Sequence, residues 1–153
     1  MPDTSNASPG TRPNPYPGYN FRFEAQGVTE AHFSQVSGMG IRVRPISWRE
    51  GGLRSIVRRL PGQVDYSDVT LKYGLTSSAD LFNWIMTAVN GSVQRKNVSI
   101  VQLDSAGAQE VIRWDLIDAW PLQWQGALLD ALDNAVAIET LVLTYEAIRV
   151  QRT

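Results

Sequence analysis

The 153-residue chain is predicted to be a mainly β (α+β) protein, an antiparallel β-barrel or sandwich of six to seven strands with one packed α-helix. Three features of the sequence indicate this fold. Segments in which apolar and polar residues alternate recur along the chain. One segment, at about 78–90, has the apolar spacing of a helix. The segment at 135–148 is apolar on both faces, which is typical of a central strand.

The first half of the domain is predicted to contain short strands and one long connection. Residues 21–25 and 31–36 alternate, and Gly27 separates them. The stretch 41–74 is interpreted as a strand, a long basic loop at 46–62 and a second strand that ends near Tyr73. Pro45 cannot donate to a strand ladder, so it predicts a bulge or bend.

The helix is expected to start at Ser77 or Ser78 as N-cap, with Asp80 in its first turn, and to stop at Asn90 and Gly91. Its apolar stripe is predicted to consist of six residues, namely Leu81, Phe82, Ile85, Met86, Ala88 and Val89.

The second half is predicted to form a hairpin of strands 98–103 and 111–120, followed by a loop and a last strand. Ile112, Trp114, Leu116 and Trp120 share a parity and should form one core layer. Pro121 is expected to end the strand. Residues 122–134 are interpreted as a loop, and 135–148 as the central strand.

Composition indicates one domain, at 21–150, after a flexible N-terminal arm at 1–20 that is rich in proline and glycine. The N-terminus lacks the apolar core of a signal peptide, and no run approaches the roughly 18 apolar residues of a membrane span. We therefore expect synthesis and assembly in the cytoplasm, without a membrane anchor. The chain has no cysteine, and no metal or other cofactor is expected.

Charge is unevenly distributed although the formal net charge is only −1. Residues 42–59 contain six arginines against Glu50, which gives +5, and residues 103–139 contain seven acidic residues against Arg113, which gives −6. Two readings stay open: both blocks are solvated or meet within one subunit, or the basic block of one copy docks on the acidic block of the next.

Candidate catalytic groups are sparse. His32 is the only histidine, and no nucleophile motif accompanies it. Asp115 and Asp118 are expected on opposite strand faces, and Asp130 with Asp133 supplies too few oxygen ligands for calcium. The acidic isoelectric point and the single short basic segment argue against nucleic-acid binding. The chain is therefore not expected to be an enzyme.

Six short segments, taken together and in order, resemble the inner-tube proteins of contractile phage tails and phage-tail-like extracellular contractile injection systems. The resemblance covers about residues 17–148. The segments are Phe33–Met39, Trp48–Gly52, Leu60–Gly62, Val69–Gly74, Ala119–Pro121 and Asn134–Leu141.

This resemblance implies the phage tail tube fold and a homohexameric ring, with rings stacked into a hollow tube that sheath contraction drives through a target envelope. It implies as partners further copies of the chain, a contractile sheath protein, baseplate and spike hub proteins, tape-measure and tube-cap proteins, and possible effector cargo in the lumen. Nucleic acid is expected only as a passenger in the lumen of a phage tube.

The same reading assigns residues to surfaces. The interface between rings and subunits is predicted at Trp48, Arg49, Glu50, Gly51, Gly52, Arg54, Arg58, Arg59, Leu60, Pro61, Gly62, Tyr16 and Tyr19. The acidic counter-surface is predicted at Asp104, Glu110, Asp115, Asp118, Asp130 and Asp133, and the lumen-facing side at Thr70 and Lys72.

The sequence departs from the family pattern at two places. Tyr73 stands where an arginine is common, and Tyr145-Glu146-Ala147-Ile148 stands where His-Glu-Gly-Leu is usual. Both departures fit a tube variant near the baseplate.

Alternative functions are a tube resembling the haemolysin-coregulated protein of type VI secretion, and a monomeric β-barrel that binds a small ligand. A hydrolase that uses His32 is a third class, with less in its favour.

Overall fold

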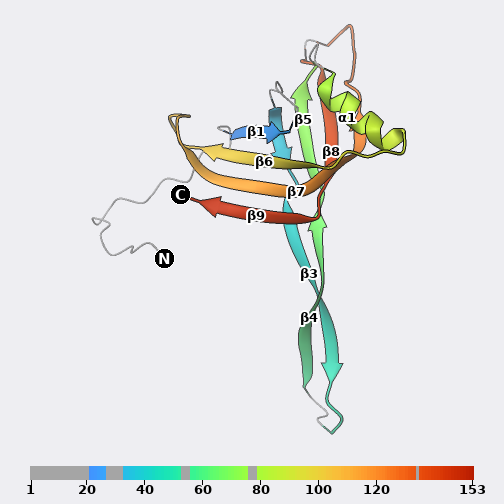
Figure 1. Ribbon diagram of the computed structural model, residues 1–153, viewed down its shortest axis with the longest axis vertical. Coiled ribbons are helices and arrows are strands. Elements are labelled where there is room, and N and C mark those ends of the chain that lie inside the picture. Colours follow the sequence, from blue (N-terminus) through green and yellow to red (C-terminus); the bar gives the residue numbers. More distant parts are fainter. Residues whose placement is uncertain (1–20, 27–32, 53–55, 76–78, 134) are drawn as a thin grey trace, which may run out of the picture.

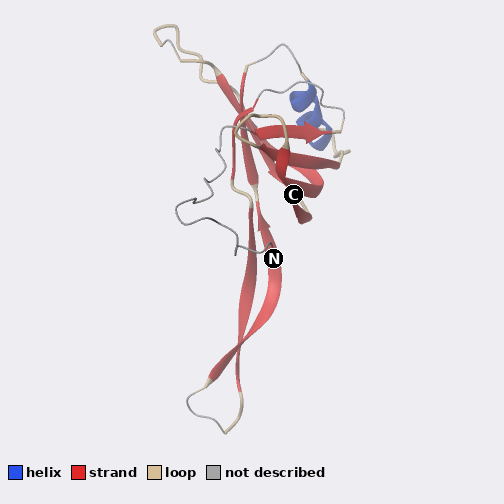
Figure 2. Ribbon diagram, turned by 90° about the vertical axis from the view of Figure 1, so that its left-hand side faces the viewer, coloured by secondary structure: helices blue, strands red, loops and turns tan. Residues whose placement is uncertain are grey.

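The computed structural model describes residues 21–26, 33–52, 56–75, 79–133 and 135–153. It has a body, built of a seven-stranded sheet and one helix, from which a long two-stranded hairpin projects (Figure 1). Figure 2 shows the same division from the side, with the helix beside the sheet at one end and the hairpin reaching away from both.

The body sheet is antiparallel throughout. Its strand order is β1-β6-β7-β8-β5-β2, and β9 pairs with β7. The strands are β1 (Phe21–Ala25), β2 (Phe33–Ser37), β5 (Val69–Gly74), β6 (Lys96–Leu103), β7 (Glu110–Gln125), β8 (Ile138–Thr144) and β9 (Ala147–Arg152).

Strand β7 bends and belongs to both halves of this sheet. Its first part pairs with β6 and β9, whereas Trp120–Gln125 pairs with β8. The change of partner follows Asp118, whose φ of 51° lies in the left-handed region. Leu116 and Ala119 are both fully buried. The prediction that Leu116 and Trp120 share one face is therefore wrong, because the irregularity between them shifts the alternation.

The end of β7 also differs from expectation. The strand does not stop at Pro121 but continues to Gln125, so part of the predicted loop at 122–134 is strand. Pro121 is buried opposite Leu143, and the register shifts directly after it. A proline is compatible with a strand at such a bulge because the ladder is already interrupted there.

The predicted single strand at 135–148 is two strands. Strand β8 ends at Thr144, and β9 begins at Ala147 and pairs with β7 through Ile112–Ile117. The short reversal lies at Tyr145 and Glu146, and the Glu146 amide donates to the carbonyl of Ile117.

The core lies where the two halves of the bent sheet face each other and the helix. It contains Val69, Leu71, Val98, Ile100, Leu116, Leu141 and Leu143, together with Tyr73, Ala119 and Tyr145 and two helix residues, Leu81 and Trp84. The edge strands β1 and β2 are in contact through the tilted rings of Phe23 and Phe33, whose centroids are 4.4 Å apart. Alternation in β5 thus gave the correct core face.

Helix α1 (Asp80–Val89) is two residues shorter at its start than predicted. Its N-cap is Ala79, and no side chain of the described residues caps it. The predicted N-cap residues Ser77 and Ser78 lie outside the described residues. Leu81 and Trp84 are its buried residues, whereas Phe82 and Val89 of the predicted stripe are exposed. The Trp84 indole donates to the Gln94 carbonyl at 2.7 Å and so ties the helix to the segment after it.

The hairpin consists of β3 (Gly40–Arg49) and β4 (Val57–Ser67). Its ladder runs from the Gly40–Ser67 pair to the Arg49–Val57 pair. The predicted loop at 46–62 is therefore wrong: both its sides are paired strand. Strand β5, predicted as the return strand, instead pairs with β2 and β8 in the body.

A bulge near Pro45 is confirmed. The register shifts between Val43 and Pro45, where β4 contributes one more residue than β3. Gly62 lies at this irregularity, and a Cβ there would come within 2.6 Å of the Arg44 carbonyl oxygen. Only glycine permits this approach without a backbone shift.

A narrow neck, defined here as Gly38, Gly40, Ser67 and Asp68, joins the hairpin to the body. Gly38 has a φ of 93°, and a Cβ on it would lie 2.4 Å from the Asp68 carbonyl oxygen. The Ser67 hydroxyl donates to the Gly38 carbonyl at 2.8 Å. Across the neck, the rings of Tyr66 and Tyr145 are 5.6 Å apart.

Candidate assembly surfaces

The hairpin exposes large apolar side chains along its whole length. Trp48 is half exposed, and seven others are exposed to a similar degree, namely Ile41, Val43, Ile46, Ile56, Val57, Leu60 and Val64. No residue of β3 is buried. An exposed apolar surface of this extent is typical of an interaction site, because a monomer in water gains nothing from it.

Arginines lie between these apolar residues. Arg44 forms an ion pair with Asp65 at 2.6 Å, and Arg58 lies 3.8 Å from Glu50. The register places Trp48 opposite Arg58, and Ser47 opposite Arg59. The structure thus brings Trp48, Arg58, Arg59 and Leu60 of the predicted interface together near the hairpin tip.

The remaining predicted interface residues divide into three groups. Arg49, Glu50, Gly51 and Gly52 are at or next to the turn of the hairpin, and Pro61 and Gly62 lie at its bulge. Arg54, Tyr16 and Tyr19 lie outside the described residues, as does His32.

The six predicted acidic residues do not form one surface. Asp104 lies in the β6–β7 turn, where its carboxylate accepts from the Ala108 amide. Asp118 lies at the bend of β7. Asp130 and Asp133 lie in the loop after β7, and Glu110 and Asp115 lie on the outer face of β7.

Glu110 and Asp115 have partners within the subunit. Arg22 and Arg113 contact Glu110 at 2.5 and 2.9 Å, and Ser99 donates to Asp115 at 2.6 Å. The Arg113 guanidinium lowers the pKa of Glu110, and Glu110 in turn raises the pKa of Arg113. Both carboxylates are therefore engaged by side chains of their own subunit.

The structure adds exposed apolar residues around Asp130 and Asp133, two members of the predicted acidic counter-surface. This surface is called here the apolar-acidic loop and consists of residues 126–133 and 135–137. It carries Leu128, Leu129, Leu132 and Val136, all at least three-quarters exposed, together with Asp130 and Asp133. The leucines of the loop are visible in the sequence, but only the structure shows that they lie outside the core and are exposed.

A polar face covers the side of β5 opposite the core. Thr70 and Lys72 alternate with the buried Val69, Leu71 and Tyr73. The register continues this face onto the neighbouring strands with Gln35, Ser37, Gln123, Gln125, Thr140 and Val142. Of the residues named for this face, Lys72 alone is charged, so the face is polar and carries little charge.

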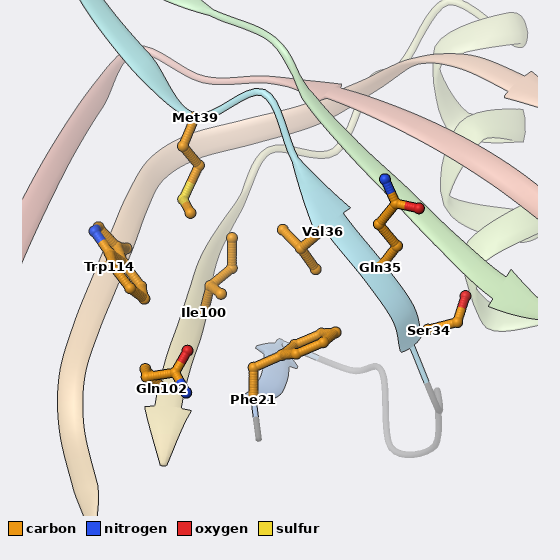
Figure 3. Close-up of a pocket in the computed structure, with 8 residues that line it drawn as sticks. All are labelled: Phe21, Ser34, Gln35, Val36, Met39, Ile100, Gln102 and Trp114. Carbon is orange, nitrogen blue, oxygen red and sulfur yellow. The ribbon is translucent and has the colours of Figure 1, made fainter. Parts of the chain in front are cut away.

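A pocket of about 280 Å³ opens between β1, β2, β6 and β7 (Figure 3). Phe21, Val36, Met39, Ile100 and Trp114 supply apolar atoms, whereas Ser34, Gln35 and Gln102 supply polar groups. Its volume is just below the range of about 300–1,000 Å³ that is usual for small-molecule sites, and it is open to solvent. The pocket therefore gives little support to the alternative of a ligand-binding barrel.

Among the described residues, no group of three or more acidic or histidine side chains is placed to hold a metal ion. Within that same part of the chain, no helix is long and apolar enough to cross a membrane.

Comparisons with known proteins agree with this geometry. The family model of the T4-like virus tail tube protein gp19 matches residues 17–149. The chain belongs to this tail tube family. It is a structural tube subunit of a contractile tail or injection system. No individually curated protein matched the sequence.

Chains in two solved structures, of a contractile injection system and of the anti-feeding prophage, share its fold. A chain of the sheath-tube complex of the extracellular contractile injection system PVC, in the extended state, is 26% identical, with a TM-score of 0.81, 91% of this chain covered and 93% of that chain. A chain of the anti-feeding prophage baseplate is 27% identical, with a TM-score of 0.79 and coverage of 92% and 98%.

A more distant likeness is to Hcp1 from Flavobacterium johnsoniae. The identity is 13%, the TM-score is 0.61, and 87% of this chain and 95% of that chain are covered. At this identity the likeness concerns the fold alone.

Proposed function

We propose that this tail tube subunit assembles with copies of itself into hexameric rings, and that the rings stack head to tail into a hollow tube inside a contractile sheath. The observation that carries the proposal is the β3–β4 hairpin, which projects from the body and has apolar side chains exposed along its length. Burial of such side chains against another copy stabilises the contact by a free energy of roughly 25 cal/mol per Å² of apolar area that is removed from water.

Open strand edges support the ring. Within the described residues, β1 pairs with β6 alone and β2 with β5 alone, so each leaves one edge unpaired. Unpaired edges are used to add strands from another chain, and closing a barrel of several subunits removes them.

The polar face on β5 and its neighbours is proposed to line the lumen, with Thr70 and Lys72 at its centre. A channel wall that is polar but carries little charge binds a passing protein weakly, so it suits transport better than retention. Lys72 would repeat around the lumen once per subunit.

Partners follow from the same assignment. The related chains come from a sheath-tube complex and a baseplate of injection particles, and the corresponding partners of this chain are proposed to be a sheath protein, a baseplate hub and a tube cap. Tape-measure protein and effector cargo are proposed contents of the lumen. A particle assembled in the cytoplasm is the proposed location.

The test is negative-stain electron microscopy of the purified full-length chain at low and high salt. We expect rings and stacked tubes at low salt, and shorter stacks at high salt because exposed ion pairs are screened. The Arg58→Glu/Arg59→Glu variant should form rings that do not stack. The control is Lys72→Glu, which makes the same change of charge per residue outside the hairpin and should still stack. A wild-type chain that stays monomeric at high concentration and low salt would overturn the proposal.

A further inference from the structure

The apolar-acidic loop exposes four large apolar side chains to solvent. Leu128 is 81% exposed, Leu129 77%, Leu132 97% and Val136 75%. Four large apolar side chains within nine residues form a patch that water solvates poorly.

Two carboxylates hold the loop in the conformation that exposes these side chains. Asp130 accepts a hydrogen bond from the Leu132 amide at 3.0 Å, and Asp133 accepts one from the Ala135 amide at 3.1 Å. Such turns use one carboxylate oxygen each. The second oxygen of each carboxylate keeps its capacity to accept from a cation.

Between these groups lies a shallow pocket of about 120 Å³, lined by Leu128, Val136, Ile138, Ala135 and the two aspartates. This space corresponds to about four water molecules, at roughly 30 Å³ each. It therefore offers apolar contact and negative charge within the reach of one inserted side chain.

The hairpin tip presents the complementary chemistry. Trp48, Ile46 and Leu60 expose apolar surface there, and Arg58 and Arg59 supply positive charge. The Arg58 side chain is 60% exposed, and its contact with Glu50, at 3.8 Å, is loose.

The two surfaces lie at opposite ends of the molecule. In Figures 1 and 2 the hairpin tip is at one end of the long axis, and the loop after β7 is at the other end, beyond the body. They cannot meet within one chain. Opposite complementary ends produce a head-to-tail contact that does not close on itself, which is the symmetry of a filament.

We propose that the apolar-acidic loop of one copy is the receptor for the hairpin tip of the next copy along the tube, with Asp130 and Asp133 opposite Arg58 and Arg59, and Leu128 and Leu132 against Trp48 and Leu60. The proposal rests on the proposed tube function and names the surface that receives the hairpin. It also selects two of the six predicted acidic residues over the other four.

The test is a charge exchange in the full-length chain, read by electron microscopy and by the protein concentration at which tubes form. Asp130→Arg/Asp133→Arg should leave rings intact but raise that concentration about tenfold or more, because exposed ion pairs are replaced by repulsion. Arg58→Asp/Arg59→Asp should do the same. Combining the four substitutions should restore stacking in part, because the exchanged charges attract again, although the arginines cannot accept the hydrogen bonds of the Leu132 and Ala135 amides.

Controls separate this contact from general effects of charge and polarity. Asp104→Asn/Asp118→Asn removes two charges outside the loop, keeps the oxygen that accepts from the Ala108 amide and suits the positive φ of Asp118, so it should stack at the wild-type concentration. Asp130→Asn/Asp133→Asn is the matched loop variant, and it should raise that concentration. Leu128→Ser/Leu132→Ser should abolish stacking, whereas Val89→Ser/Val93→Ser, which also replaces exposed apolar residues, should not. Thermal unfolding of each variant identifies any that fail to fold.

Three results would overturn the inference while leaving the tube function intact. The first is normal tubes from the loop variants. The second is loss of stacking in both charge variants without rescue by their combination, which places the hairpin on another surface. The third is loss of stacking in the loop variants together with normal stacking of Arg58→Asp/Arg59→Asp, which gives the loop another occupant. Failure of the wild-type chain to form rings would refute the proposed function itself.

Discussion

Trp84 should be the main attachment of the helix to the body, and Trp84→Phe tests this. The side chain is 2% exposed, its indole donates to the Gln94 carbonyl at 2.7 Å, and the Lys96 ammonium lies 5.4 Å from its ring centroid. A ten-residue helix without a side-chain cap is not stable alone, so its packing decides whether it forms.

The expected loss of stability follows from these contacts. Phenylalanine leaves the Gln94 carbonyl without its donor, which costs about 1–3 kcal/mol, and it weakens a cation–π contact worth about 0.5–1 kcal/mol. The sum is roughly 2–4 kcal/mol. For a chain of this length the midpoint of thermal unfolding should fall by roughly 5–15 °C.

Far-UV circular dichroism should record this unfolding at high ionic strength, where assembly contributes least to the apparent stability. Val89→Ala is the matched control on the same helix, because Val89 is 68% exposed, and it should change stability by less than about 0.5 kcal/mol. A midpoint for Trp84→Phe equal to that of the control would refute the assignment of Trp84 as the anchor.

Three further predictions concern the body and the hairpin. Burial raises the pKa of Tyr73 above its ordinary value; stability from the neutral phenol is therefore present below about pH 10 and lost as pH rises. Tyr73→Phe should lose less stability than wild type in alkaline denaturant titrations; equal losses would contradict this. Gly62→Ala should distort the hairpin, because its Cβ meets the Arg44 carbonyl, and should weaken stacking in electron micrographs without lowering the midpoint of the body. Asp118, with its positive φ, should tolerate Asn, whereas Asp118→Val should cost about 1–2 kcal/mol in urea unfolding; equal stability of the two variants would exclude strain there.

Alternation in the sequence was sufficient where one strand face is buried. Val69, Leu71 and Tyr73 alternate with Thr70 and Lys72, and the structure confirms both the strand and its core face. The fold class and the family were likewise accessible from the sequence, because several short segments occur in a specific order.

The hairpin was harder to predict because both of its faces are exposed within one subunit. No core imposes alternation on β4, so arginines and apolar residues mix, and Pro61-Gly62 resembles a loop signal. The strand extends through this stretch because its partner β3 continues beside it. Only the structure reveals that the two sides of the basic segment pair with each other as strands.

The helix and the loop after β7 illustrate a second limit. Apolar residues lie on several sides of α1, namely Leu81, Phe82, Trp84 and Ile85. Apolar spacing alone therefore does not determine which of them faces the sheet. Leu128 and Leu132 are of a residue type that is usually buried. They are exposed because β7 ends before them and the loop that follows does not reach the core. Tertiary surroundings, and not local pattern, decide both cases.

The narrow neck has a consequence for how the hairpin gains its rigidity. The hairpin meets the body through few side-chain contacts, chiefly those of Ser67 and of Tyr66 with Tyr145. A two-stranded ribbon with so little support is marginally stable in water. Amide protons of the β3–β4 ladder should therefore exchange quickly in the isolated subunit and slowly in an assembled tube, so that the neighbouring copy completes the folding of this arm.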